Sequence, residues 1–434
     1  MSSKHTHSLD QFSVGRRSFN SFAIFASLSA TFIGGGYTLG NAAKVFHLGM
    51  FYAFALLGFS LKEILVGLFI APRMAAYRDC LSIGDIMSRH YGTAAKVITG
   101  IFSVLICTGI VGAQVGAIGA IFRAFFHINE LWGILIGFAV IIVYSALGGM
   151  RAVVYTDILQ FLILAVGIPL VFVLGIYYVG GFTAIIHKLP QAHVFFWHDS
   201  HTLLPFVFLF ITFMLGETLV PPYVQRLLMA KHTWQTRRAI VASGLLSIPF
   251  FLIAGGIGLI ALLINPQLNA NLALPFVVET VLPGFLRGFV IASLLAIIMS
   301  SAAGFLNAAA VSLVNDIIKP LKPQIKPMTL LSLAKASVFA IGASSMIFAL
   351  AIKNVLDILL YAYNFWSPII LVPLLALLFN IKVKSWHFFI GASAGLVGML
   401  VWSFAFEQIY HVSAIIIGIL CNLLFFSGAK QCIR

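Results

Sequence analysis

Two adjacent serines and a run of glycines are the residues of this chain that could bind a small cation. Ser300 and Ser301 lie side by side in a long apolar run, and Gly34, Gly35 and Gly36 interrupt another. Sodium is coordinated in transporters by hydroxyls and by backbone carbonyls at helix breaks. A membrane serine can also simply bond the carbonyl one turn back, so the residues alone leave a structural role open.

Two apolar segments are long enough to cross a membrane but are broken in the middle. The run 18–46 is broken by the three glycines, and the run 201–226 is broken at Gly216-Glu217 and at Pro221-Pro222. In lipid, irregular backbone is tolerated only where it is buried in protein or lines a cavity. Breaks at corresponding positions of two halves are typical of transporters built from inverted repeats, with the binding site between the breaks.

The composition predicts an all-α membrane protein. Of 434 residues, 61% are hydrophobic and only 9% are charged, whereas soluble proteins carry about 25% charged residues. A helical span needs about 20 apolar residues. The expected spans, about twelve by that length, are 18–46, 49–71, 92–122, 131–147, 153–179, 202–226, 238–264, 275–315, 329–352, 355–380, 386–406 and 410–428.

The net charge of +14 reflects membrane topology rather than nucleic-acid binding. If the N-terminus is cytoplasmic, most of the 26 Lys and Arg residues fall on cytoplasmic segments, as the positive-inside rule requires. The inner-leaflet lipid would attract this charge. The short loops favour a prokaryotic inner membrane, and both termini are expected in the cytoplasm.

Charged and polar residues inside the spans are candidates for function because they are costly in lipid. Asp157 begins the fifth expected span, where it could instead cap a helix N-terminus. Glu217 lies at the second break, where it could also be a cap. Lys62 and Glu63 are adjacent, and we expect an ion pair with other spans, with contact to a solute as the alternative. Gln114 could line a site or bridge helices.

Three segments resemble the sodium:solute symporter family, and their sequences are most similar to its high-affinity choline transporter branch. The first segment runs from 144 to 160 and contains Gly-Gly, Ala-Val, Thr-Asp and Gln at the family spacing. The second contains Tyr223, Gln225 and Arg226. The third contains Met299-Ser300-Ser301-Ala302.

The resemblance implies a LeuT-type fold and sodium-driven solute symport by alternating access, not an enzyme. Two inverted five-helix repeats would occupy about 18–180 and 201–380 of a core at 18–380. A tail at 1–17 would precede the core, and two extra helices with a short tail would follow at 381–434. The helix that usually precedes the core is missing here, which again places the N-terminus inside. We expect a monomer or a weak homo-oligomer.

The resemblance also implies the sodium ligands. They are the carbonyls of Ala30, Ile33 and Ile297 and the hydroxyls of Ser300 and Ser301. Asp157 would belong to a second sodium site or to the release path. The hydroxyl positions of that second site hold Ala303 and Gly304 here, which predicts one sodium ion per solute.

The solute is predicted to be a small polar organic molecule, such as an amino acid, a betaine-like compound or a vitamin-like compound. The resemblance implies that Tyr223 is an inner gate, whereas a lone tyrosine near an interface could instead serve as an anchor. Three positions surround choline in choline-type members of the family. Here Phe32 is aromatic but Ile110 and Val220 are not, so the resemblance does not predict choline as the solute of this chain. Proton coupling and a non-transporting sensor are the alternatives. The expected solute contacts are Phe32, Gly34, Gly35, Gly36, Tyr37, Gln114, Glu217 and Val220.

Overall fold

The structure is a computed structural model that describes residues 8–195, 200–351, 355–381, 383–410 and 412–428. Within these residues the chain is helical, apart from an isolated bridge between Phe19 and Ala230. The principal helical elements are α1 (Leu9–Val14), α2 (Ser21–Phe32), η3 (Gly36–Gly40), α3 (Asn41–Leu48), α4 (Phe51–Ala55), α5 (Leu57–Leu65), η4 (Val66–Ile70), η5 (Ala71–Tyr77), α6 (Ile83–Phe126), α7 (Glu130–Val179), α8 (Phe182–Lys188), α9 (Gln191–Val194), α10 (Ser200–Gly216), α11 (Pro221–Leu228), α12 (Thr233–Ile264), α13 (Ala273–Val281), α14 (Gly284–Val311), η8 (Ser312–Ile318), α16 (Pro327–Ala351), α17 (Val355–Tyr363), η9 (Ser367–Leu371), α18 (Val372–Leu378), α19 (Trp386–Ala405), α20 (Glu407–Tyr410) and α21 (Ala414–Gly428).

The spans agree with the prediction in type and place. Over the described residues, eight helices are long and apolar enough to cross a membrane, and two further pairs are bent spans. The segments Leu131–Val143 and Ala414–Ser427 are shorter apolar helices at two other expected positions. The expected span 275–315 was wrong at its start, because α13 ends at Val281 and the chain turns at Pro283 before α14.

Both predicted breaks are present. The axis bends by 58° between α2 and η3, and by 52° between α10 and α11. At the first break, a Cβ on Gly34 would lie 2.6 Å from Ser301 Oγ, so only glycine fits there. At the second break, Leu219 adopts a positive φ of 56°, and Pro221 starts α11 at a position where proline is favoured.

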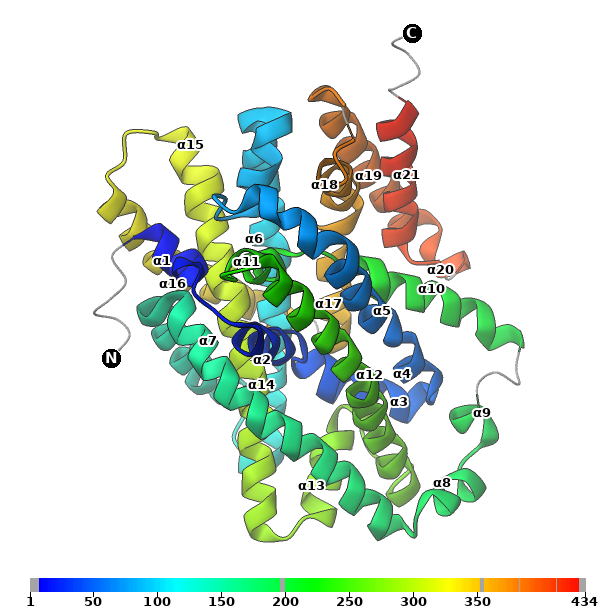
Figure 1. Cartoon of the computed structure of the whole chain (residues 1–434). Coiled ribbons are helices and arrows are strands. Elements are labelled where there is room, and N and C mark those ends of the chain that lie inside the picture. The colour runs from blue at the N-terminus through cyan, green and yellow to red at the C-terminus, as the bar shows by residue number, and fades with distance from the viewer. Residues whose placement is uncertain (1–7, 196–199, 352–354, 382, 411, 429–434) are drawn as a thin grey trace.

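α2 and α11, which meet the two breaks, lie in the middle of the bundle, whereas α10 extends towards its edge (Figure 1). α2 packs against α7, α12 and α14, and α11 packs against α14, α6 and α2. α19 and α21 pack on each other at one edge of the molecule and contact the core through η9. The two breaks are therefore enclosed by the long helices, as irregular backbone in a membrane requires.

Candidate functional site

The first break brings the serine pair of α14 against the end of α2. The Ser301 hydroxyl donates to the Thr31 carbonyl over 2.6 Å. The last carbonyls of a helix have no partner in a following turn, and α2 ends at Phe32 with Ile33 outside helical geometry. Hydroxyl and carbonyl oxygens therefore meet in a buried place between α2 and α14.

Asp157 extends this oxygen cluster from α7. Its carboxylate accepts hydrogen bonds from the Ser300 hydroxyl at 2.6 Å and from the Ser27 hydroxyl at 2.5 Å. Both serines and the aspartate are buried. Asp157 lies inside α7, well past the kink at Gly149, so it is not the helix cap that was considered as the alternative.

Arg226 supplies the positive charge beside Asp157. Its guanidinium is buried, and Nη2 lies 3.4 Å from Asp157 Oδ2. Nη2 also donates to Thr31 Oγ1 at 2.6 Å, while Nε donates to Ser27 Oγ at 3.1 Å and Nη1 donates to the Pro222 carbonyl at 3.0 Å. A buried charge needs this degree of pairing to be tolerated. α11 is thereby tied to α2 and α7 through one side chain.

The structure thus gathers Ser300, Ser301 and Asp157 around the end of α2, where Ala30 and Ile33 lie. Ile297 is buried one turn before Ser301 on α14. Sequence reasoning missed Ser27 and Thr31, whose spacing of four residues puts both on one helical face.

At the second break, Glu217 lies between two tyrosines. Its Oε2 accepts hydrogen bonds from the Tyr37 hydroxyl at 2.7 Å and from the Tyr363 hydroxyl at 3.1 Å, and the two hydroxyls contact each other. All three side chains are buried. These two partners of Glu217 are hydroxyls rather than backbone N–H groups, so the carboxylate is directed at side chains of η3 and α17.

Side chains after α17 close the carbonyls of the second break. Trp366 Nε1 donates to the Thr218 carbonyl at 2.8 Å. The Ser367 hydroxyl lies 2.7 Å from both the Leu215 and the Gly216 carbonyls. Tyr363 and Trp366, both in the tenth expected span, thus hold the second break by hydrogen bonds.

Gln114 connects α6 to the first break. Its Oε1 accepts a hydrogen bond from the Gly35 N–H over 2.9 Å, and a Cβ on Gly35 would lie 2.7 Å from Ala117. Of the two roles left open for Gln114, the structure shows the bridging one.

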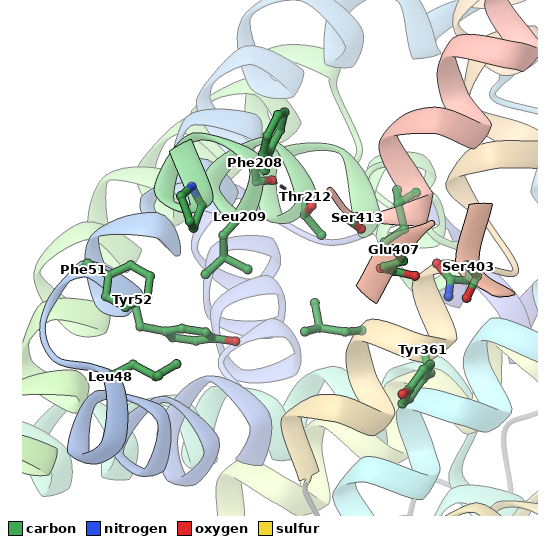
Figure 2. Close-up of a pocket in the computed structure, with 14 residues that line it drawn as sticks. Leu48, Phe51, Tyr52, Phe208, Leu209, Thr212, Tyr361, Ser403, Glu407 and Ser413 are labelled. Carbon is green, nitrogen blue, oxygen red and sulfur yellow. Dashed lines mark hydrogen bonds between the residues drawn. The ribbon is translucent and has the colours of Figure 1, made fainter. Parts of the chain in front are cut away.

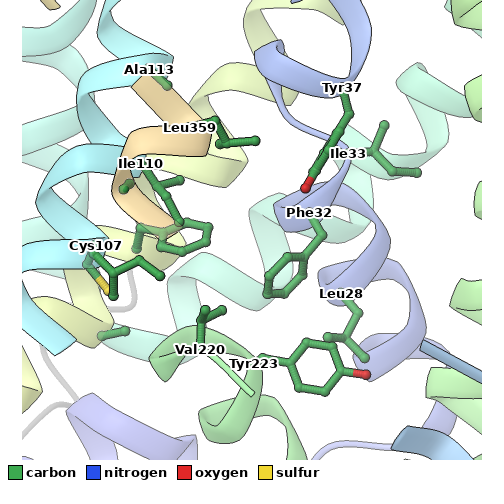
Figure 3. Close-up of a cluster of buried hydrophobic side chains, with 14 of the residues drawn as sticks. Leu28, Phe32, Ile33, Tyr37, Cys107, Ile110, Ala113, Val220, Tyr223 and Leu359 are labelled. Carbon is green, nitrogen blue, oxygen red and sulfur yellow. The ribbon is translucent and has the colours of Figure 1, made fainter. Parts of the chain in front are cut away.

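The aromatic surroundings of Phe32 are richer than the sequence indicated. Its ring centroid lies 5.3 Å from Tyr223, 5.8 Å from Phe305 and 6.1 Å from Phe59. Figure 3 shows Phe32, Val220 and Tyr223 gathered near Ile110, from different helices. Rings from helices distant in sequence therefore surround Phe32, although Ile110 and Val220 are aliphatic.

The ion pair predicted for Lys62 and Glu63 also differs from expectation. The two residues pair with each other, with 2.7 Å between Lys62 Nζ and Glu63 Oε1. The second oxygen of Glu63 accepts a hydrogen bond from Tyr223 over 3.1 Å, so the pair is linked to α11.

A cavity of about 540 Å³ opens near the end of α3 and the start of α10 (Figure 2). Its wall includes Tyr52, Thr212, Tyr361 and Glu407. Tyr52 packs on Phe213 with 5.8 Å between ring centroids, and Phe213 packs on Tyr37 at 6.3 Å. The cavity therefore ends one ring layer from the Glu217 cluster.

The sequence is similar to those of known transporters. The chain is 28% identical over 405 residues to the human high affinity choline transporter 1, which covers 86% of this chain and 67% of that protein. It is 23% identical over 419 residues to the high-affinity proline transporter PutP of Bacillus subtilis (strain 168), which covers 92% and 88%.

The structure superposes on a substrate-bound, outward-open Na+-coupled sialic acid symporter with a TM-score of 0.87 and 20% identity, over 100% of this chain and 94% of that one. It also superposes on Mhp1, a nucleobase-cation-symport-1 family transporter, with a TM-score of 0.65 and 15% identity, over 97% and 95%. These similarities confirm the predicted LeuT-type fold.

The family comparison covers most of the chain. The sequence model of the sodium:solute symporter family matches residues 12–397. This range includes both breaks, the serine pair and Asp157. The matched proteins are transporters rather than enzymes, as predicted. The chain therefore belongs to the sodium:solute symporter family.

Proposed function

We propose that this protein is a sodium-coupled symporter that imports a small polar organic solute by alternating access. The observation that carries the proposal is the hydrogen bond from Ser301 to the Thr31 carbonyl at the end of α2. It joins a hydroxyl of α14 to the carbonyl end of a broken helix, which is where transporters of this kind bind cations. The proposed ligands are the carbonyls of Ala30, Ile33 and Ile297 and the hydroxyls of Ser300 and Ser301.

We propose one sodium ion per solute. Asp157, the carboxylate of a second site, is already paired with Arg226. A Cβ on Gly304 would lie 2.9 Å from Arg226 Nη2, so the space beside Asp157 is taken by the guanidinium. Asp157 then belongs to the release path of the single ion. When sodium leaves Ser300, the Asp157 carboxylate stays paired with the Arg226 guanidinium, so its charge remains neutralised.

The solute is proposed to bind between the two breaks. Phe32, Tyr37, Val220 and Glu217 are buried there, together with the backbone of Gly34 to Gly36. Two tyrosine hydroxyls hold the Glu217 carboxylate in place. One carboxylate in an apolar surrounding favours a neutral or zwitterionic solute with a small amine. Tyr223, bonded to Glu63, is the proposed inner gate.

The proposed setting is an inner membrane with both termini in the cytoplasm, and with repeats at about 18–180 and 201–380. Membrane lipid surrounds the long apolar helices. The basic residues of the cytoplasmic segments then face the anionic leaflet.

Thermal unfolding of the purified protein tests the function. Solutes from an amino-acid and vitamin library are added in sodium or in potassium buffer, because a ligand that binds only the folded state raises the melting temperature. We expect one solute class to stabilise the protein in sodium and not in potassium. Uptake of that solute into proteoliposomes should follow a sodium gradient. Uptake driven by a proton gradient alone contradicts sodium coupling, and binding without uptake favours a sensor.

A further inference from the structure

Lys62 holds a positive charge next to the proposed solute site. It lies on α5, inside the membrane-spanning segment Phe51–Tyr77, and is 2% exposed. Its ammonium lies 3.7 Å from the ring centroid of Phe59, 4.9 Å from that of Tyr223 and 5.6 Å from that of Phe32. All three distances are within the range of cation–π attraction.

These three rings come from three separate elements. Phe32 ends the first broken helix, Tyr223 lies on the second half of the other broken helix, and Phe59 is on α5. A cluster of aromatic faces around one cation is the arrangement that recognises substituted ammonium headgroups. Phe32 is also an expected solute contact. The three rings therefore form an ammonium pocket at the edge of the site, which we call the Lys62 pocket.

The Lys62 ammonium occupies this pocket, and Glu63 neutralises its charge. Glu63 Oε1 accepts a hydrogen bond from the ammonium over 2.7 Å, and Glu63 Oε2 accepts one from Tyr223 over 3.1 Å. A buried ammonium is expensive to leave unpaired in a membrane. A cationic solute could enter the pocket only by displacing Lys62 from Glu63 and from the three rings. Loss of these contacts makes that displacement unfavourable.

We propose that Lys62 is a resident ammonium that determines solute specificity by filling this pocket. It excludes solutes with a substituted ammonium headgroup and leaves Glu217, held by Tyr37 and Tyr363, as the carboxylate for a small amine. This inference rests on the proposed placement of the solute between the breaks. It narrows the solute class to amino-acid-like and vitamin-like molecules and removes betaine-like ones.

Replacement of Lys62 by alanine tests the pocket directly. Lys62→Ala removes the three carbons and the nitrogen that n-propylammonium contains, and it leaves the three rings and Glu63 in place. We expect n-propylammonium and tetramethylammonium to raise the melting temperature of this variant, with affinity on the order of tenfold or more above that for the wild type. 1-Propanol, which has no charge, should not raise the melting temperature of this variant.

Two further variants separate the pocket from general effects. Lys62→Met removes the charge but fills the space with an unbranched chain, so neither cation should stabilise it. Lys62→Ala with Glu63→Gln avoids an unpaired carboxylate and serves if the single variant does not fold. Equal stabilisation of the wild type and Lys62→Ala by tetramethylammonium overturns the proposal, as does a folded alanine variant that responds to neither cation. The measurement uses neither sodium nor transport, so its failure is distinct from failure of the proposed symport.

Discussion

The two helix breaks are similar in bend but differ in what surrounds their carbonyls. At the break after α2, the Thr31 carbonyl is met by the Ser301 hydroxyl, with Ser300 and Asp157 alongside. At the break after α10, the Leu215, Gly216 and Thr218 carbonyls are closed by Ser367 and Trp366. The first break offers oxygens that can exchange a hydrogen bond for a cation. At the second break, the polar side chain proposed to face the site is that of Glu217.

This difference assigns a separate task to each break. A cation needs several oxygens at once, and these converge at the first break. A solute needs shape, aromatic surface and a few placed polar groups, and these lie between Glu217 of the second break and Phe32 at the end of α2. Each region also contains a fixed cation of the chain, Arg226 beside Asp157 and Lys62 beside Phe32. The fixed cations limit which external cations each region can take.

The largest expected effect follows from removing the fixed cation at the first break. Arg226→Gln leaves Asp157 buried without its counter-charge, and breaking one partner of a buried pair costs about 3–5 kcal/mol. The melting temperature should fall, and sodium should restore more of it than in the wild type because the ion can take the vacated place.

The paired variant Arg226→Gln with Asp157→Asn is the control. Because the two side chains interact, their losses should not add, and the double variant should be more stable than the sum of the two single changes predicts. Strict additivity, with no extra sodium response, would break the assignment of Arg226 to the cation region.

The sequence predicted much of the scaffold but few of the pairings. Glycine and proline runs indicated both breaks, because these residues are unfavourable inside a helix, although single prolines such as Pro169 and Pro249 lie within α7 and α12. The approach of Ser301 to α2 followed from the family pattern. By contrast, Arg226 and Asp157 are 69 positions apart, and an apolar pattern does not say which buried polar groups become neighbours. The same reason explains why the rings around Lys62 were not foreseen.

The serine pair should give the next largest effect. Ser301→Ala removes a proposed sodium ligand, and a loss of about 1.4 kcal/mol raises the sodium concentration for half-maximal uptake about tenfold. Ser345→Ala is a matched control, because its buried hydroxyl bonds the Ile341 carbonyl one turn back. Unchanged sodium dependence in Ser301→Ala would contradict the proposed site, whatever its effect on stability.

The smallest effect is expected at the second break, where it sharpens the comparison most. Ser367→Ala removes the hydroxyl that closes the Leu215 and Gly216 carbonyls, and a typical hydrogen bond contributes about 1 kcal/mol net. The variant should melt slightly lower and bind its solute more weakly, because the segment that carries Glu217 is less firmly held. Its sodium dependence should match that of the wild type, since the proposed ligands lie on α2, on Ile33 directly after it and on α14. If Ser367→Ala instead shifts the half-maximal sodium concentration as far as Ser301→Ala does, the carbonyls of the second break also take part in cation binding, and the two breaks do not have separate tasks.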